Sequence, residues 1–166
     1  MKILRMIPVL SIIICFTSAA ADSVQPLFYI ERSLNANVVH YDAQIDDKGA
    51  LNRNEPVIAY WLMNAEDGRR ESLTFIERTT AYGFSAEPDI KTGDYLLAIV
   101  SIKERPIRIF MADGKAQAVT TIRGKDAFLE RVFIQASGAF SRPHAIEFYG
   151  KDTATGEDLS EKVNIE

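Results

Sequence analysis

"IRIFMADGKAQAVTTI", residues 107–122, holds two runs rich in apolar and β-branched residues, separated by a short polar turn. The turn contains Asp113-Gly114, a pair favoured in two-residue hairpins because both central positions prefer positive φ. Strands joined by so short a connection pair antiparallel. This stretch therefore predicts a β-hairpin.

Similar segments lie on both sides of this hairpin, at 94–102, 128–136 and 145–150. Short turn sequences separate them, which predicts an antiparallel meander. Strand-like segments also occur nearer the N-terminus, at 27–33, 37–45 and 57–63. We therefore expect an all-β domain in which an antiparallel meander closes as a barrel or a sandwich.

The segment 37–45 has the alternation of a half-buried strand. Val39, Tyr41 and Ala43 fall on one face, whereas His40 and Asp42 fall on the other, mostly polar face. We expect the first set to face the core.

One segment, "ESLTFIERTTAYGF" (71–84), has helical spacing. Leu73, Ile76 and Thr80 recur on one face, and Gly83 suits a left-handed C-terminal cap. Its threonines also suit a strand, and that alternative stays open. We expect one short helix near 71–82.

The N-terminus has the layout of a secretory signal peptide. Lys2 and Arg5 precede an apolar run from Met6 to Phe16, which is shorter than the ~20 residues of a membrane-spanning helix. Small residues follow, and we place the cleavage after Ala21. The chain then divides into a signal peptide, 1–21, and a single β-rich domain, 22–166, without a membrane span. We expect it in the periplasm or secreted.

The composition of the mature chain excludes several classes of protein. The one cysteine of the sequence, Cys15, lies inside the predicted leader, so neither a disulfide nor thiolate chemistry is expected. Isoleucines precede it, which disfavours lipid attachment. The chain has 19 basic and 23 acidic side chains, and no basic stripe indicates nucleic acid.

Several stretches resemble an uncharacterised domain-of-unknown-function family of exported bacterial proteins. "IERSLNAN" (30–37) and "AYGF" (81–84) are the most distinctive pieces, and "PVIAYWLMNAEDG" (56–68) belongs to the same resemblance. The resemblance covers nearly the whole mature chain. It implies export and a compact domain, and it implies no chemistry.

Motifs for catalysis are scarce. The sequence lacks a Gly-x-Ser-x-Gly elbow, a phosphate-binding glycine loop and a His-Glu-x-x-His pair. His40 and Asp42 share a strand face and could orient a general base or bind a metal. A metal site needs three or four ligands, so two solvated side chains are the simpler interpretation. We expect no cofactor and no metal.

"FYIERS" (28–33) returns as "TFIERT" (74–79). The first copy lies in a predicted strand and the second in a predicted helix, which argues against a duplicated domain. Strand alternation turns Arg32 toward the core face, and helical spacing turns Glu77 inward. We expect these two charges to pair, because neither can stay buried alone. Ordinary surface charges are the alternative.

Polar and aromatic side chains near Arg32 suggest the mouth of a pocket. Pockets combine apolar walls with a few placed polar groups. Asparagines in strand connections more often form Asx turns, and aromatic residues more often fill a core. The candidate ligand-binding residues are Arg32, Asn35, Asn37, Tyr60, Trp61, Glu77 and Tyr82.

These features favour a non-enzymatic binding or interaction module. Its ligand would be a small polar or amphipathic molecule, or a peptide or protein of the cell envelope. One alternative is a hydrolase-like or metal-dependent enzyme around His40 and Asp42. Another is a structural envelope protein that acts through its surface.

Overall fold

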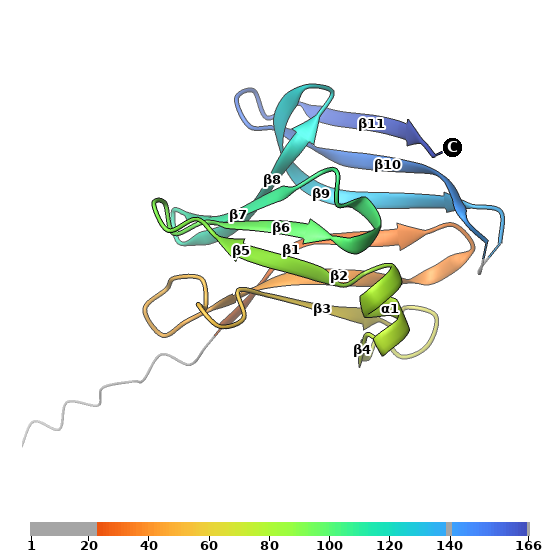
Figure 1. Cartoon of the computed structure of the whole chain (residues 1–166), viewed down its shortest axis with the longest axis horizontal. Coiled ribbons are helices and arrows are strands. Elements are labelled where there is room, and N and C mark those ends of the chain that lie inside the picture. The colour runs from red at the N-terminus through yellow and green to blue at the C-terminus, as the bar shows by residue number, and fades with distance from the viewer. Residues whose placement is uncertain (1–22, 139–140, 166) are drawn as a thin grey trace, which may run out of the picture.

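The computed structural model describes residues 23–138 and 141–165, so the predicted signal peptide and its cleavage site lie outside the described residues. Strands dominate, as the sequence predicts, with one short α-helix and one 3-10 turn (Figure 1). The elements are β1 (Ser23–Arg32), β2 (Asn35–Ile45), β3 (Val57–Leu62), β4 (Arg70–Ser72), α1 (Phe75–Thr80), β5 (Phe84–Pro88), β6 (Tyr95–Ile99), η1 (Val100–Ile102), β7 (Ile107–Ala112), β8 (Lys115–Ile122), β9 (Lys125–Ala136), β10 (Pro143–Asp152) and β11 (Asp158–Asn164).

The sheet divides at the long strand β9. Along one edge β9 pairs with β10, which in turn pairs with β11. Along its other edge, β9 pairs first with β8, over residues 125–128, and then with β1, over residues 131–134. Two arms therefore leave the same edge: a first arm in the order β1-β2-β3-β4 and a second arm in the order β8-β7-β6-β5.

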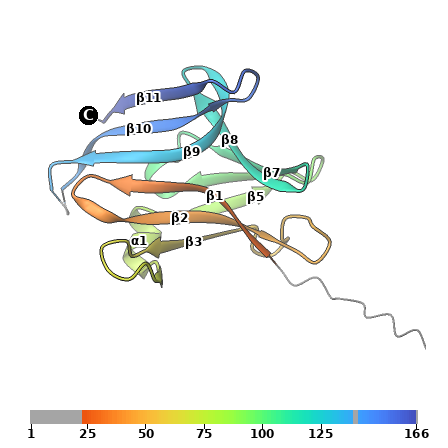
Figure 2. The ribbon, with the colours of Figure 1, turned by 180° about the vertical axis from the view of Figure 1, so that it is seen from behind.

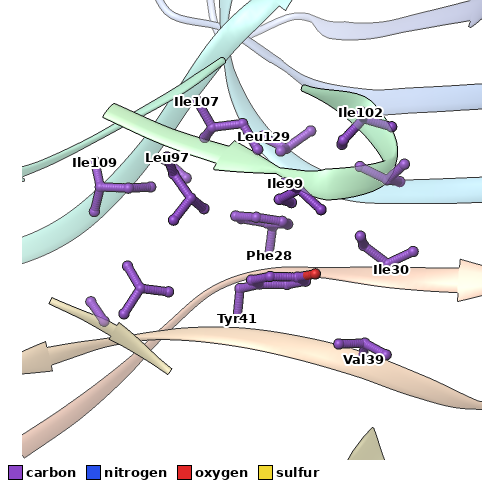
Figure 3. Close-up of a cluster of buried hydrophobic side chains, with 14 of the residues drawn as sticks. Phe28, Ile30, Val39, Tyr41, Leu97, Ile99, Ile102, Ile107, Ile109 and Leu129 are labelled. Atoms are coloured by element: carbon purple, nitrogen blue, oxygen red, sulfur yellow. The ribbon is translucent and has the colours of Figure 1, made fainter. Parts of the chain in front are cut away.

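The two arms curl over one another and enclose the core (Figures 1 and 2). Each fully buried aliphatic or aromatic side chain contributes about 1.5–3 kcal/mol to stability. Figure 3 shows side chains of β1 and β2 opposite those of the second arm: Phe28, Ile30, Val39 and Tyr41 lie across from Leu97, Ile99, Ile107 and Ile109. The result is an all-β fold of the half-barrel kind.

Two local predictions are confirmed. Asp113 and Gly114 connect β7 to β8 with φ of 50° and 74°, the values that the Asp-Gly hairpin requires. In β2, Val39, Tyr41 and Ala43 are fully buried, as the alternation predicts.

Other features differ from the prediction. The pairing of β1 with β9 is parallel and therefore not part of a simple meander. The short edge strand β4 comes from a segment without strand-like alternation, and β5 alternates only over the four residues Phe84–Glu87 before its proline. The helix is confined to Phe75–Thr80 and buries none of its own residues, so Ile76, expected on the inward face, is 70% exposed.

Candidate functional site

The free ends of the two arms leave a cavity between β3 and β5. We call it the edge cleft, and its volume is about 440 Å³. Strands β3 and β5 do not pair with each other, so the curled sheet stays open at this place. The cleft is lined by Glu55, Val57, Ile58, Ala59, Tyr60, Ser72, Leu73, Arg78, Gly83 and Phe84.

Part of the backbone of β3 points into this opening. The Gln44 N–H donates to the Pro56 carbonyl at 2.9 Å, which identifies the hydrogen-bonded pairs of the β2–β3 ladder. Because these pairs alternate, the peptide groups of Val57 and Ala59 point away from β2. Strand β4 covers that edge only along Tyr60–Leu62. The beginning of β3 therefore has an edge to which no strand is paired within the described residues.

The facing edge belongs to β5. The Val100 N–H donates to the Gly83 carbonyl at 2.8 Å, so Gly83 belongs to a hydrogen-bonded pair of the β5–β6 ladder. By the same alternation, the peptide groups of Phe84 and Ala86 point away from β6. Pro88, at the end of this edge, has no N–H to offer. A proline there protects an exposed edge from unwanted pairing.

Helix α1 closes one end of the edge cleft. Thr74 and Glu77 form a capping box, in which each side chain binds the backbone N–H of the other residue. After the helix the chain turns back sharply at Gly83. A Cβ atom there would lie 1.8 Å from the Arg78 carbonyl oxygen, so only glycine lets β5 start this close to α1. The segment between β4 and β5 thus crosses from one arm to the other.

Arg78 is the cationic side chain that α1 brings to the cleft. Its Nε donates to the Leu73 carbonyl at 3.1 Å, which fixes the orientation of the guanidinium group. Among residues 23–138 and 141–165, Arg78 has no ion pair with a carboxylate. Glu55 lines the opposite end, before β3, where its carboxylate accepts from the Gln44 amide at 2.7 Å. The two ends of the cleft therefore carry opposite charge.

Four of the predicted ligand-binding residues meet next to α1. The Trp61 indole N–H donates to Glu77 at 2.9 Å, and its ring packs edge-to-face on Tyr82 with centroids 5.2 Å apart. Burial raises the pKa of Tyr82, and the Arg32 guanidinium opposes the rise. Burial alone would raise the pKa of Glu77, but hydrogen bonds from Thr74 and Trp61 lower it.

The expected ion pair between Arg32 and Glu77 does not form. Arg32 donates instead to the backbone carbonyl of Ser141 and, at 3.5 Å, to that of Gly138. Glu77 is occupied by its capping box and by Trp61. Arg32 and Glu77 are linked only through the residues between them. Glu77 accepts from Trp61, Trp61 packs on Tyr82, and Arg32 lies near Tyr82. Backbone carbonyls of a loop can accept the hydrogen bonds of a partly buried guanidinium, and the sequence pattern does not reveal such partners.

The two asparagines stabilise turns. The Asn35 side chain accepts from the Asn37 N–H at 3.0 Å, which is the Asx turn considered as the alternative to a ligand site. The Asn37 side chain accepts from the Ala65 N–H at 2.9 Å and so fastens the next loop. Neither lines the edge cleft.

Tyr60 is the predicted residue that reaches the edge cleft, and it also contacts His40 and Asp42. Asp42 is buried and not solvated as expected. The Tyr60 hydroxyl donates to Asp42 at 2.6 Å. Burial, and then this bond, raise the pKa of Tyr60 to about 12. His40 stacks between Tyr60 and Tyr29.

His40 and Asp42 lie close to each other but do not form a hydrogen-bonded pair. His40 Nδ1 lies 3.9 Å from Asp42 Oδ1, too far for a hydrogen bond. Burial lowers the pKa of His40, and the Asp42 charge opposes this change. No third histidine or carboxylate joins the two in a metal-binding group within the described part of the chain.

Sequence reasoning missed the edge cleft itself. The groups that distinguish the cleft are unpaired peptide N–H and C=O groups. Because almost every residue has these groups, no residue type in the sequence indicates where they are left unpaired. Arg78 was visible next to Glu77, and the Thr-x-x-Glu capping box at 74–77 was the available signal for where α1 begins.

The chain has the architecture of an open, curled β-sheet domain with an accessible pair of edges. It belongs to the family described as Domain of unknown function (DUF4833), which matches residues 28–162. This agrees with the resemblance drawn from the sequence. Comparison with curated proteins and with solved structures finds no match. In the ranges that the structure describes, no helix is both long and apolar enough to cross a bilayer.

Proposed function

We propose that this protein is an exported, non-enzymatic binding module that holds an extended polypeptide segment in the edge cleft. The observation that carries the proposal is the pair of uncovered strand edges on the two sides of one cavity. The N–H and C=O groups of an extended peptide alternate with the same spacing as those of a free strand edge. An extended peptide is therefore the ligand that matches these two edges. The bound segment would add a strand between β3 and β5.

The dimensions of the cleft suit a short segment. The uncovered part of β3, Val57–Ala59, corresponds to about 10 Å of strand at about 3.3 Å per residue. The cavity of about 440 Å³ is within the usual range of ligand pockets, about 300–1,000 Å³. Leu73 and Phe84 supply apolar walls, and Ser72 and Arg78 supply polar groups. This mixture provides affinity through the backbone and selectivity through side chains.

Export is supported by the sequence of the leader, with its basic start, apolar run and small residues before Ala21. A module without cysteine in the mature chain also tolerates an oxidising compartment without mispaired disulfides. Its partner would then be a protein of the envelope or an exported peptide.

The test is capture of peptides from a synthetic pool of random decapeptides. The immobilised domain, residues 22–166, is washed, the retained peptides are sequenced by mass spectrometry, and single peptides are titrated by fluorescence polarisation. The decisive variant is Ala86→Pro, which removes an N–H on the free edge of β5, two residues beyond the cleft-lining Phe84, without removing a hydrogen bond to β6. We expect it to abolish binding.

The matched control is Ala86→Val, which keeps the N–H and favours a strand. It should bind the same peptides as the wild type. Circular dichroism and thermal unfolding establish that both variants are folded. The proposal fails if no peptide is retained, or if Ala86→Pro binds as tightly as Ala86→Val. A small molecule that co-purifies in the cleft and excludes peptides would also overturn it.

A further inference from the structure

We infer that the added strand enters the edge cleft with its C-terminus first and places its free α-carboxylate against Arg78. This inference rests on the proposed function and specifies its ligand. Three features lead to it: a closed end, an unpaired cation at that end, and an acidic side chain at the other.

The closed end follows from the path of the chain. The connection from β4 through α1 to β5 passes from the first arm to the second, and Leu73, Arg78 and Gly83 on this connection line the cleft. A polypeptide that lies between β3 and β5 meets this connection and cannot continue in a straight line. The segment that fits best therefore ends there, and a chain terminus fits better than an internal stretch.

The charge of the closed end selects which terminus it is. The Nε of Arg78 is held by the Leu73 carbonyl, and this positions the rest of the guanidinium group beside the cavity. No carboxylate within the described residues neutralises it. Guanidinium binds carboxylate through charged, often paired hydrogen bonds. An α-ammonium group would be repelled here and would suit the Glu55 end instead.

The direction of the bound strand follows. β3 runs toward α1, and β5 starts at α1 and runs away from it (Figure 1). A strand that ends at Arg78 is thus parallel to β3 and antiparallel to β5. The fold already contains such an arrangement, since β1 is antiparallel to β2 and parallel to β9.

The experiment uses peptides selected from the decapeptide pool. Each is synthesised as a free acid, as a C-terminal amide and as a free acid extended by two glycines. We expect the amide to bind about tenfold more weakly or worse, because it loses the charged contact. The extended form should lose a similar factor, because α1 blocks the added residues.

Variants of Arg78 test whether its positive charge causes the preference for the free acid. In Arg78→Met the free acid should bind as weakly as the amide, and Arg78→Lys should retain part of the preference for the acid. Arg69→Met is the matched control, because Arg69 pairs with Glu66 and Glu71 and does not line the cleft. It should keep the full preference.

The outcomes distinguish the two proposals. Peptides that are lost in Ala86→Pro, yet bind equally well as acid and as amide, would overturn the C-terminal recognition and leave the strand addition standing. Equal loss of the acid and amide forms in Arg78→Met would mean that Arg78 only supports the helix, and would also overturn it. Retention of no peptide at all would overturn both.

Discussion

The substitution Gly83→Ala tests the geometry that closes the edge cleft. The added Cβ atom would lie 1.8 Å from the carbonyl oxygen of Arg78 and 2.6 Å from its carbonyl carbon. These are backbone atoms, so no side-chain rotation relieves the overlap. The φ of Gly83 is not positive, so alanine is not strained there by the backbone conformation. The loss of stability therefore reports the steric contact with Arg78 alone. Helix α1 or the start of β5 has to move by about 1 Å to relieve a contact of 1.8 Å.

The expected loss in the free energy of unfolding is about 2–4 kcal/mol. Forcing atoms into a packed site costs about 1–3 kcal/mol. Displacement of α1 also breaks the hydrogen bond from Trp61 to the Glu77 carboxylate, and a bond to a charged group contributes about 1.5–3 kcal/mol. Some of this is regained as the short helix relaxes outward, since it buries none of its own residues.

Urea unfolding followed by circular dichroism measures the stability, and tryptophan fluorescence measures the position of α1. Trp61 is the one tryptophan of the chain, and its indole N–H binds α1 through Glu77. Its emission should shift to longer wavelength in Gly83→Ala. The control is Gly138→Ala, whose Cβ atom would meet no atom of the described residues closer than 3.7 Å. We expect it to stay within about 0.5 kcal/mol of the wild type. A Gly83→Ala protein as stable as this control, with unchanged emission, would refute the reasoning.

Two further predictions concern pH and processing. Hydrogen bonds from Arg105, followed by one from the backbone N–H of residue 123, lower the pKa of Glu161 to about 2. Since the folded pKa is below the ordinary 4.5, this stabilisation is complete above pH 4.5 and is lost as the pH falls toward 2. Glu161→Gln should therefore cost about 1–3 kcal/mol at pH 7, and in acid titrations its difference from the wild type should shrink below about pH 4. N-terminal sequencing of the exported protein should start at Asp22, after cleavage behind Ala21. A mature chain that begins with a lipid-modified Cys15 would contradict this.

Local patterns predicted the parts of the fold that depend on neighbouring residues. The Asp113-Gly114 turn and the alternation of Val39, Tyr41 and Ala43 reflect backbone sterics and burial within a few residues. The parallel pairing of β1 with β9 has no such local cause. It joins residues about a hundred positions apart and depends on how the whole core packs.

The two missed strands show a related limit. β4 has the sequence Arg-Glu-Ser, which lacks the composition of a typical strand, and β5 alternates only over Phe84–Glu87 before it ends in a proline. Each exists because a neighbouring strand supplies hydrogen bonds: β3 for β4, and β6 for β5. Edge strands of this kind are shaped by their context, and these two frame the candidate site.

The repeated Ile-Glu-Arg has a different consequence in each copy. In β1 the residues alternate, so Ile30 is buried and Arg32 is used inside the fold, where it donates to loop carbonyls. In α1 successive residues are about 100° apart around the helix axis. Glu77 is held on the inner side by Trp61, and the next residue is thereby turned toward the edge cleft. The predicted Arg32–Glu77 pair was wrong for this reason: Glu77 is occupied by its capping box and Trp61, and Arg32 donates to loop carbonyls, although its buried Nε has no partner. Like Arg32, the arginine of the second copy, Arg78, has no carboxylate partner among the described residues. Arg78 is solvent-exposed at the edge cleft, where a ligand can reach its guanidinium group.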